Sequence, residues 1–193
     1  MTELVPENYF ATLDLLKIFG RTAPLHVDLG CCDGSFLCEL AKRYPDQDFL
    51  GIEKLVGRVA RARRKAAALE NVRVLNVESS YAVRHLLPIA SVETFYLLFP
   101  DPWPKRRHQR RRIVTSGFLD SVHRALAPEG LFRIATDQSD YFDQIRRLTQ
   151  DGSGFAIITR ADGDLPLSKF ERRFRDQGTP IYRLTLRKIS PVR

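Results

Sequence analysis

Four acidic side chains, each placed directly after a short apolar run, are the residues of this chain best suited to hold a ligand. They are Asp28 in VDLGCCDG, Glu53 in GIEK, Glu78 in NVESS and Asp101 in FPDPW. Apolar runs that alternate with amphipathic stretches predict a parallel sheet, whose ligands bind beyond the carboxyl ends of the strands. The four carboxylates are therefore expected to meet at one edge of a sheet, where they would suit a positively charged ligand.

A glycine-rich loop follows the first of these acids. It contains Gly30 and Gly34, and small residues are expected where a backbone approaches a ligand closely. Glu53 lies 23 residues after Gly30, close to the separation at which an acid binds a ribose diol in Rossmann-like folds. A pyrophosphate is disfavoured, because Cys32 replaces the second glycine of GxGxxG and Asp33 adds a negative charge. The sulfonium and ammonium groups of S-adenosylmethionine suit these acids better.

The most distinctive stretch is FPDPWPKRRHQRRR at residues 99–112. Its three prolines within five residues predict a stiff, extended loop, which would hold Asp101, Trp103 and Lys105 at the end of a buried strand. Trp103 could stack on a nucleobase or cover the apolar side of the loop. A carboxylate can accept both N1–H and N2–H of a guanine, which suits Asp101 or Glu171 for holding that base.

The charge balance predicts an anionic partner. The chain has 31 Lys and Arg against 23 Asp and Glu, a net charge of +8. The excess is clustered at residues 105–112, 58–65 and 172–175, as in nucleic-acid-binding proteins, although the cluster at 58–65 could equally be a solvated helix face.

No apolar window approaches membrane-spanning length and no secretion signal is recognisable, so a soluble, cytoplasmic protein is expected. Three cysteines form no recognisable metal pattern, so no metal is expected.

The order of apolar and amphipathic stretches predicts a single α/β domain over residues 1–193, with a short N-terminal segment at 1–20 and a substrate-side loop at 161–180. Strands are expected at 25–29, 49–52, 72–76, 92–98, 131–135, 155–159 and 181–187, and helices at 35–43, 56–69, 81–87 and 113–126. The sheet would be mostly parallel and seven-stranded, ending in an antiparallel hairpin. A methyltransferase and a small dehydrogenase would both fit this order.

Four motifs, in order, resemble those of the bacterial tRNA (guanine-N7)-methyltransferase family of the TrmB type. They are GIEK, FPDPWPKRRHQRRR, Thr136-Asp137 and SKFERR. The resemblance covers roughly residues 20–188. It implies a Rossmann-like, class I S-adenosylmethionine-dependent methyltransferase that methylates N7 of guanine 46 in the variable loop of tRNA.

The resemblance also implies roles for individual residues. The cofactor-binding positions, which include the two glycines of the loop, are Asp28, Gly30, Gly34, Glu53, Glu78 and Asp101. Asp101 is also the catalytic residue. The substrate-binding positions, with the arginines of the basic run, are Lys105, Arg106, Arg107, Arg110, Asp137, Ser168, Lys169, Phe170 and Glu171. The family has glycine where Cys32 stands.

Guanine N7 is unprotonated at neutral pH, so it can attack the sulfonium methyl in line without a general base. Asp101 would then orient the base and stabilise the moving positive charge. Two alternatives remain open. Cys32 in the glycine-rich loop favours an RNA-binding protein that has lost its cofactor. A small-molecule methyltransferase or dehydrogenase is the other, but it would leave the basic run unexplained. Asp28 and Asp33 could also be turn or helix-capping residues. The chain is expected to act as a monomer or homodimer.

Overall fold

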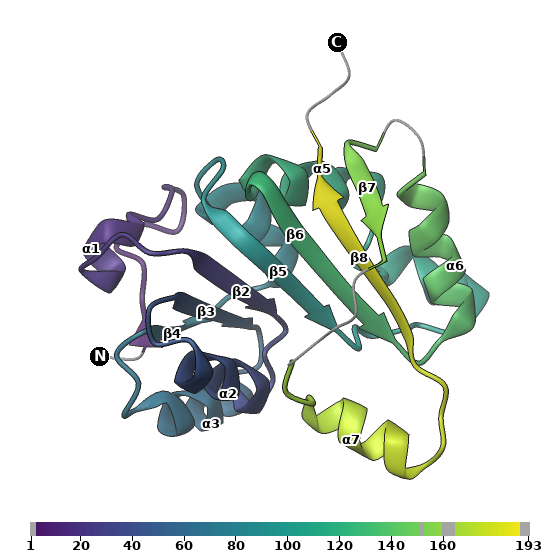
Figure 1. Ribbon diagram of the computed structural model, residues 1–193, viewed down its shortest axis with the longest axis horizontal. Coiled ribbons are helices and arrows are strands. Elements are labelled where there is room, and N and C mark those ends of the chain that lie inside the picture. Colours follow the sequence, from purple (N-terminus) through teal and green to yellow (C-terminus); the bar gives the residue numbers. More distant parts are fainter. Residues whose placement is uncertain (1–2, 151–152, 160–164, 190–193) are drawn as a thin grey trace.

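The computed structural model describes residues 3–150, 153–159 and 165–189, in which one mixed sheet is flanked by helices (Figure 1). The strands are β1 (Glu3–Leu4), β2 (Leu25–Leu29), β3 (Asp48–Glu53), β4 (Val72–Asn76), β5 (Val92–Leu98), β6 (Leu126–Thr136), β7 (Phe155–Ile158) and β8 (Tyr182–Lys188). The α-helices are α1 (Leu15–Phe19), α2 (Ser35–Arg43), α3 (Val56–Ala66), α4 (Ser79–Tyr81), α5 (Ser116–Ala125), α6 (Ser139–Leu148) and α7 (Lys169–Asp176). A π-helical turn, η1 (Ala82–Leu86), continues α4, and η2 (Arg106–Arg111) is a 3₁₀ helix.

The sheet has the order β1-β4-β3-β2-β5-β6-β8-β7. All neighbours from β1 to β6 are parallel, whereas β8 is antiparallel to both β6 and β7. The expected seven strands and the antiparallel C-terminal pair are thus confirmed, and β1 adds a two-residue strand at the edge of β4. The direction of strand order reverses at β2, which creates the crevice where ligands of such sheets bind.

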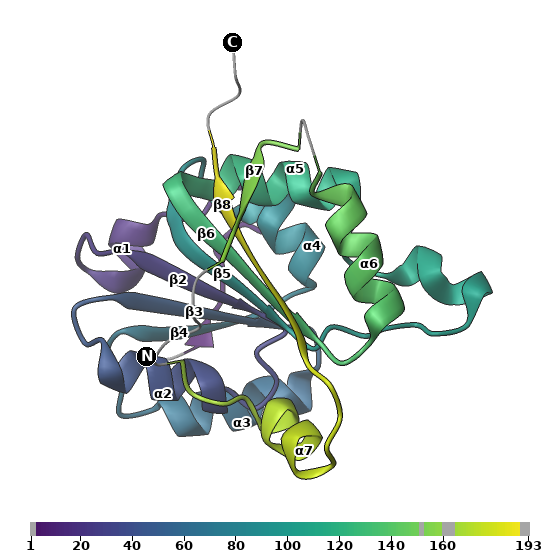
Figure 2. The ribbon, with the colours of Figure 1, turned by 45° about the vertical axis from the view of Figure 1, so that its right-hand side comes forward.

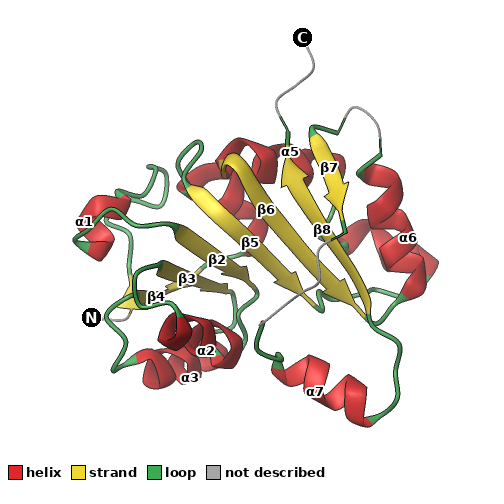
Figure 3. Cartoon of the chain, viewed as in Figure 1, coloured by secondary structure: helices red, strands yellow, loops and turns green. Residues whose placement is uncertain are grey.

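Helices cover the two faces of the sheet in different places (Figures 1 and 2). On one face α2 and α3 pack over β3 and β4, burying Phe36, Leu40 and Val59 against Phe49 and Val74. The opposite face carries η1, α5 and α6, whose buried side chains join those of β2, β5 and β6 in the larger apolar core. In Figure 3, α7 lies by itself beyond the carboxyl ends of the strands. This position puts α7 beside the crevice that the strand order creates.

Two helix boundaries differ from those expected, because polar side chains cap the helices. The predicted helix 81–87 begins earlier, since the Glu78 carboxylate accepts a hydrogen bond of 2.9 Å from the Tyr81 N–H. The predicted helix 113–126 begins only at Ser116, since the Thr115 hydroxyl accepts one of 3.2 Å from the Phe118 N–H. Both ends follow the general preference for a side-chain acceptor at the start of a helix.

The strand predicted at 131–135 is longer than expected. β6 begins at Leu126, and the register with β5 shifts between Val92 and Thr94, so the Pro128–Gly130 stretch is an irregularity within the strand. Glu129 has a φ of 61° there. An extra stretch of this kind bends a strand without ending it.

The prediction of a loop over residues 161–180 was wrong for its second half. Lys169–Asp176 form α7, and the Ser168 hydroxyl accepts a hydrogen bond of 3.1 Å from the Glu171 N–H at its start. Residues 160–164 lie outside the described part of the chain. Ser168, Lys169, Phe170 and Glu171 are therefore presented by the first turn of a helix.

Within the described ranges, no helix is both long and apolar enough to cross a membrane. The same residues contain no group of three His, Cys, Asp or Glu side chains arranged to hold a metal ion. Cys31, Cys32 and Cys38 are free thiols.

Candidate active site at the carboxyl ends of the strands

Asp28 lies in β2, one residue before the strand ends, and its side chain is buried. Burial, and to a smaller extent the nearby charge of Glu53, raise the pKa of Asp28 to about 7. Neither a turn nor a helix cap explains this carboxyl group, since it belongs to the strand itself. A buried carboxyl group with a raised pKa at a strand end is typical of a functional site.

Glu53 ends β3 and connects the glycine-rich loop to the β3–α3 loop. Its carboxylate accepts a hydrogen bond of 3.2 Å from the Cys32 N–H and one of 2.9 Å from the Leu55 N–H. The Arg58 guanidinium lies 3.7 Å away in an ion pair. A carboxylate has about four acceptor positions. Glu53 can therefore hold both loops and still accept hydrogen bonds from a ligand.

The two glycines of the loop have different structural roles. Gly30 has a φ of +78°, and a Cβ there would meet no atom within 4 Å, so the backbone angle alone explains it. Gly34 has a φ of +72°, and its Cβ would lie 2.9 Å from that of Ala62 in α3. Cys32, between them, has a φ of 52°, in the region that favours glycine. The loop therefore keeps a glycine-like backbone at Cys32 despite the side chain.

Asp33 has the structural role that the sequence left open. Its carboxylate accepts hydrogen bonds from the Ser35 backbone at 3.2 Å and hydroxyl at 2.8 Å, and it forms an ion pair of 2.7 Å with Lys65. Partial burial opposes ionisation, but the hydrogen bonds from Lys65 and Ser35 outweigh it and lower the pKa of Asp33 to about 2. This carboxylate joins the start of α2 to α3.

A cavity of about 370 Å³ lies where the strands end, and we call it the main cavity. Its polar lining includes Glu53, Glu78 and Asp101, together with Gly30. Glu78 also caps α4, as described above, whereas the Asp101 side chain is exposed. Three of the four acids predicted to meet at this edge therefore share one space.

Aromatic and arginine side chains form another wall of the main cavity. Trp103 and Phe170 line it, and the Arg111 guanidinium lies 5.0 Å from the centre of the Trp103 ring. Trp103 is half-buried, has a φ of 44° and contacts His108 edge to face. The ring therefore packs against η2 and faces the cavity, and its stacking on a nucleobase stays a prediction.

A second cavity, of about 30 Å³, lies between the glycine-rich loop and the start of α7. Asp28, Gly30 and Cys32 line it on one side and Ser168 and Phe170 on the other. Gly30 and Phe170 belong to the linings of both cavities, so the two spaces adjoin. The fourth acid, Asp28, is thus next to the other three. The contact with α7 was not visible in the sequence, because nothing there relates residues so far apart.

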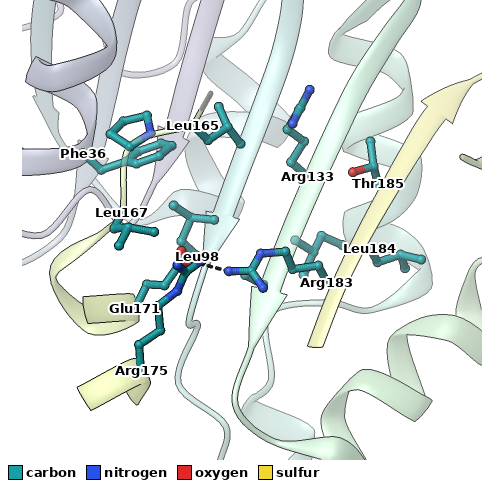
Figure 4. A pocket seen from close by; sticks show the side chains of 13 residues that line it. Phe36, Leu98, Arg133, Leu165, Leu167, Glu171, Arg175, Arg183, Leu184 and Thr185 are labelled. Atoms are coloured by element: carbon teal, nitrogen blue, oxygen red, sulfur yellow. Dashed lines mark hydrogen bonds and ion pairs between the residues drawn. The ribbon is translucent and has the colours of Figure 1, made fainter. Parts of the chain in front are cut away.

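Glu171 points away from the main cavity. Figure 4 shows its carboxylate in a third cavity, of about 270 Å³, where it forms ion pairs with Arg183 and, at 2.7 Å, with Arg175. Leu98 and Phe36 form the apolar side of that cavity. In this arrangement Glu171 fixes α7 to β8, and its carboxylate is not available for the edge of a base.

The basic run after Asp101 is divided between surface and core. Lys105, Arg106, Arg107 and Arg110 are exposed on or beside η2, outside the main cavity. Arg112 is 3% exposed, and its guanidinium donates to the Pro102 carbonyl at 2.8 Å and to Gln144 at 2.7 Å. Arg112, although it belongs to the basic cluster at residues 105–112, therefore anchors the proline-rich loop and is too buried to bind a phosphate. Asp137 accepts a hydrogen bond of 2.5 Å from Gln138 and lines neither the main nor the second cavity.

Some residues that shape the site were missed by sequence reasoning. Arg58 pairs with Glu53, Arg111 stacks on Trp103, and Phe99 packs 5.2 Å from the ring of Phe174 in α7. The apolar pair Ile113-Val114 directly after Arg112 was the signal that the basic run enters the core there.

The lining of the adjoining cavities fits S-adenosylmethionine. The two linings together contain five carboxylates, those of Asp28, Asp33, Glu53, Glu78 and Asp101, and four basic side chains, those of Lys54, Arg58, Arg111 and Lys169. Arg58 is paired with Glu53, and Asp33 with Lys65 outside the cavities. Such a set favours a ligand with cationic groups and a sugar diol. A main cavity of about 370 Å³ is also within the range of small-molecule sites.

Comparisons with known proteins agree with this geometry. A profile described as a putative methyltransferase matches residues 22–184. The tRNA (guanine-N(7)-)-methyltransferase of Leifsonia xyli subsp. xyli is 40% identical over 188 residues, which cover 92% of this chain and 82% of that protein. The protein of the same name from Thermotoga maritima is 34% identical over 194 residues, and the match covers 97% of this chain but only 62% of that protein.

The chain belongs to the bacterial tRNA (guanine-N7)-methyltransferase family. Solved structures agree on the fold of this family member. The 16S rRNA methyltransferase KamB superposes with a TM-score of 0.67 at 15% identity, covering 91% of this chain and 93% of that one. The antibiotic-resistance methyltransferase Kmr gives 0.62 at 20% identity, covering 92% of each chain. At such low identity these structures establish only that the chain shares the fold of these methyltransferases.

Proposed function

We propose that this chain transfers the methyl group of S-adenosylmethionine to N7 of a guanine in tRNA. One observation carries the proposal: Glu53, Glu78 and Asp101 line a single cavity, and the Asp101 loop leads directly into an exposed run of basic residues. A cofactor site and a polyanion-binding surface are thereby contiguous. The names of the 33–40% identical relatives support the same activity.

The carboxylates have distinct tasks in holding the cofactor. Glu53 would accept hydrogen bonds from the ribose diol, Glu78 would contact the adenosine, and Asp28 with the loop from Gly30 to Gly34 would hold the methionine end. When bound, S-adenosylmethionine would supply a methyl group on a cationic sulfur: the lone pair of guanine N7 would form the new N–C bond in line as the C–S bond breaks, and the sulfur would leave as a neutral thioether. Ionised Asp28 would offset the positive charge of that end.

Asp101 is the catalytic residue of the proposal. Its exposed carboxylate stands at the mouth of the main cavity, where it can accept hydrogen bonds from the edge of a guanine and orient N7 toward the cavity. Positive charge moves to the base during transfer, and a carboxylate fixed nearby stabilises that charge. N7 carries no proton, so Asp101 removes none. Positioning of the reacting atoms supplies the rest of the rate.

Exposed side chains on η2 and α7 bind the nucleic acid around the target. Lys105, Arg106, Arg107 and Arg110 bind phosphates beside the Asp101 loop. Ser168, Lys169 and Phe170 face the cavities from α7. Asp137 and Glu171 contribute to substrate binding from outside the main cavity, and Glu171 would do so by fixing α7. The enzyme works in the cytoplasm as a monomer or homodimer, and guanine 46 of the variable loop is the target.

The test is transfer of labelled methyl groups to unmodified bulk tRNA, followed by nucleoside analysis. Label in 7-methylguanosine is the expected result. A transcript with adenine at position 46 should receive none, and label there would contradict the choice of target. Binding of tRNA without binding of S-adenosylmethionine would contradict the enzyme and favour an RNA-binding protein that has lost its cofactor.

A further inference from the structure

The helix α3 has a charge pattern that the proposed active site does not use. Residues 54–69 contain six basic side chains and no acidic one, so α3 lacks the oppositely charged i,i+4 pairs that support an exposed helix. Arg58 and Lys65 are paired with Glu53 and Asp33 of the active-site rim. Within the described part of the chain, Arg61 and Arg64 are exposed, and their guanidinium groups make no hydrogen bond or ion pair. The guanidinium groups of Arg61 and Arg64 therefore face solvent.

This helix is held tightly against the rim of the site. A Cβ on Gly34 would lie 3.0 Å from the Ala62 backbone, and Lys65 reaches both Asp33 and the Ser35 hydroxyl at the start of α2. Arg61 directly precedes Ala62, and Arg64 follows it by two residues. The helix that carries both arginines is thus held against the glycine-rich loop.

A groove lies between α7 and the start of α2, where Lys65 of α3 contacts Asp33 and Ser35. Its volume is about 550 Å³, and Asp33 and Ser35 form one wall while Lys169, Arg172 and Arg173 of α7 lie on the other. Arg172 and Arg173 are exposed, and their guanidinium groups form no hydrogen bond or ion pair with the described residues. Asp176 also lines the groove, and Asp33 is neutralised by Lys65. The groove therefore keeps a positive balance.

The cavity mouth has a second basic element on its other side. η2 with Arg106, Arg107 and Arg110 follows the Asp101 loop and is tied to α6 by Gln109, which donates to Asp140 at 3.4 Å. In Figure 2, α7 and α3 both lie below the sheet, away from α6. Two separate basic surfaces thus lie on opposite sides of the main cavity.

We propose that the α3–α7 surface, made by Arg61, Arg64, Arg172 and Arg173, binds the sugar-phosphate backbone of the RNA on the side of the target nucleotide opposite to η2. The inference rests on the proposed function, and adds a second phosphate-binding surface to it. The RNA strand would then cross the cavity mouth with phosphates held on both sides, which presents one nucleotide to Asp101. Surfaces of unpaired arginines without apolar side chains suit a polyanion better than a protein partner.

The experiment compares two double variants in the full-length protein. Arg61→Gln/Arg64→Gln removes charge from α3 and keeps side chains of good helix propensity. Arg146→Gln/Arg147→Gln is the matched control, since these two arginines are adjacent and exposed near the end of α6. The affinity for tRNA is measured from about 50 to about 200 mM salt. The KM for tRNA, the kcat and the affinity for S-adenosylmethionine are measured alongside.

The α3 variant is expected to bind tRNA about tenfold more weakly at the lower salt and to show a salt slope smaller by about 1.5, because two phosphate contacts are lost. The KM for tRNA should rise while the affinity for S-adenosylmethionine stays within about twofold. The control should match the wild type. Arg172→Gln/Arg173→Gln should repeat the effect of the α3 variant.

A salt slope and KM equal to those of the wild type in both the α3 and the α7 variants would overturn the inference. An equal loss in the α6 control would also overturn it, because the effect would then be one of net charge. Failure of the wild-type protein to form 7-methylguanosine would instead contradict the proposed function, and the binding slopes would still be measurable.

Discussion

The Glu53 carboxylate accepts a hydrogen bond of 3.2 Å from the backbone N–H of Cys32. This contact joins the end of β3 to the residue that departs from the glycine of the family. The Cys32 N–H points to Glu53 because its backbone has a φ of 52°. The substitution therefore leaves the loop able to bring Glu53 and Gly30 to the same cavity, which favours an intact cofactor site.

Restoring glycine at this position should change little. In Cys32→Gly the cost of a left-handed backbone is removed, but the unfolded chain gains freedom, and the two effects nearly cancel. We expect the free energy of unfolding to stay within about 1 kcal/mol of the wild type, and the affinity for S-adenosylmethionine within about threefold. Chemical denaturation and titration calorimetry check both. A gain in affinity of tenfold or more would identify Cys32 as a defect.

Removing the carboxylate of Asp101 should abolish most activity without affecting the fold. The side chain is exposed and only lines the cavity, so Asp101→Asn should unfold at the temperature of the wild type. The kcat for methyl transfer should fall by about 100-fold or more, since the carboxylate acts on the charge that develops on the base. Asp120→Asn, on the exposed side of α5, is the matched control and should keep full activity. Near-normal turnover of the Asp101 variant would refute the catalytic role.

Asp28 should make stability and cofactor binding depend on pH in opposite directions. Its pKa is raised by burial, and then by Glu53, to about 7, so the folded protein holds a proton that the unfolded chain releases near pH 4. The stability that this proton provides is present below about pH 4 and is lost as pH rises to about 7. Relative to Asp28→Asn, the free energy of unfolding of the wild type should therefore fall over that interval and level off above it.

Binding of S-adenosylmethionine should respond in the opposite sense, because the ionised form of Asp28 pairs with a cation. The wild-type affinity should fall as pH decreases through about 7, whereas Asp28→Asn should bind more weakly and without this step. Thermal melts and calorimetric titrations at matched pH values measure the two effects. Parallel pH profiles for wild type and variant would show that Asp28 is not the titrating group.

Arg112 should matter for stability more than any other member of the basic run. Its buried guanidinium holds the Pro102 carbonyl and Gln144, pairs with Asp140 and lies 4.6 Å from the centre of the Tyr141 ring. We expect Arg112→Ala to lower the free energy of unfolding by about 3 kcal/mol. The exposed Arg110→Ala should change it by less than about 0.5 kcal/mol. Equal stabilities in urea denaturation would contradict the anchoring role.

The strands were predictable from sequence because each is a short apolar run with a clear end. β2, β4 and β5 have the predicted bounds, and the acid after or at the end of each run indicated the site. α6 was missed although Tyr141 and Ile145 are spaced by four residues, because the surrounding residues are polar. α7 is more polar still, and its signal was Ser168 followed three positions later by Glu171, a pattern typical of a helix start.

Side-chain directions could not be predicted from sequence in the same way. Glu171 is adjacent to Phe170 in the chain, yet Phe170 lines the main cavity and Glu171 forms ion pairs with Arg175 and Arg183 in another. Successive helical residues face different directions, so such an assignment requires the helix and its rotation to be known. Arg112 is a similar case, since only its contact with α6 distinguishes it from its exposed neighbours.

The position of α7 within the chain determines when the site is completed during synthesis. α7 lies between β7 and β8, and β8 inserts between β6 and β7 as the last strand. A nascent chain that has not yet released β8 lacks the partner of Glu171, so α7 cannot dock and the second cavity has no outer wall. Long-range pairing of this kind is also slow to form. The protein therefore becomes competent to bind its cofactor only after β8 has been synthesised and has paired with β6.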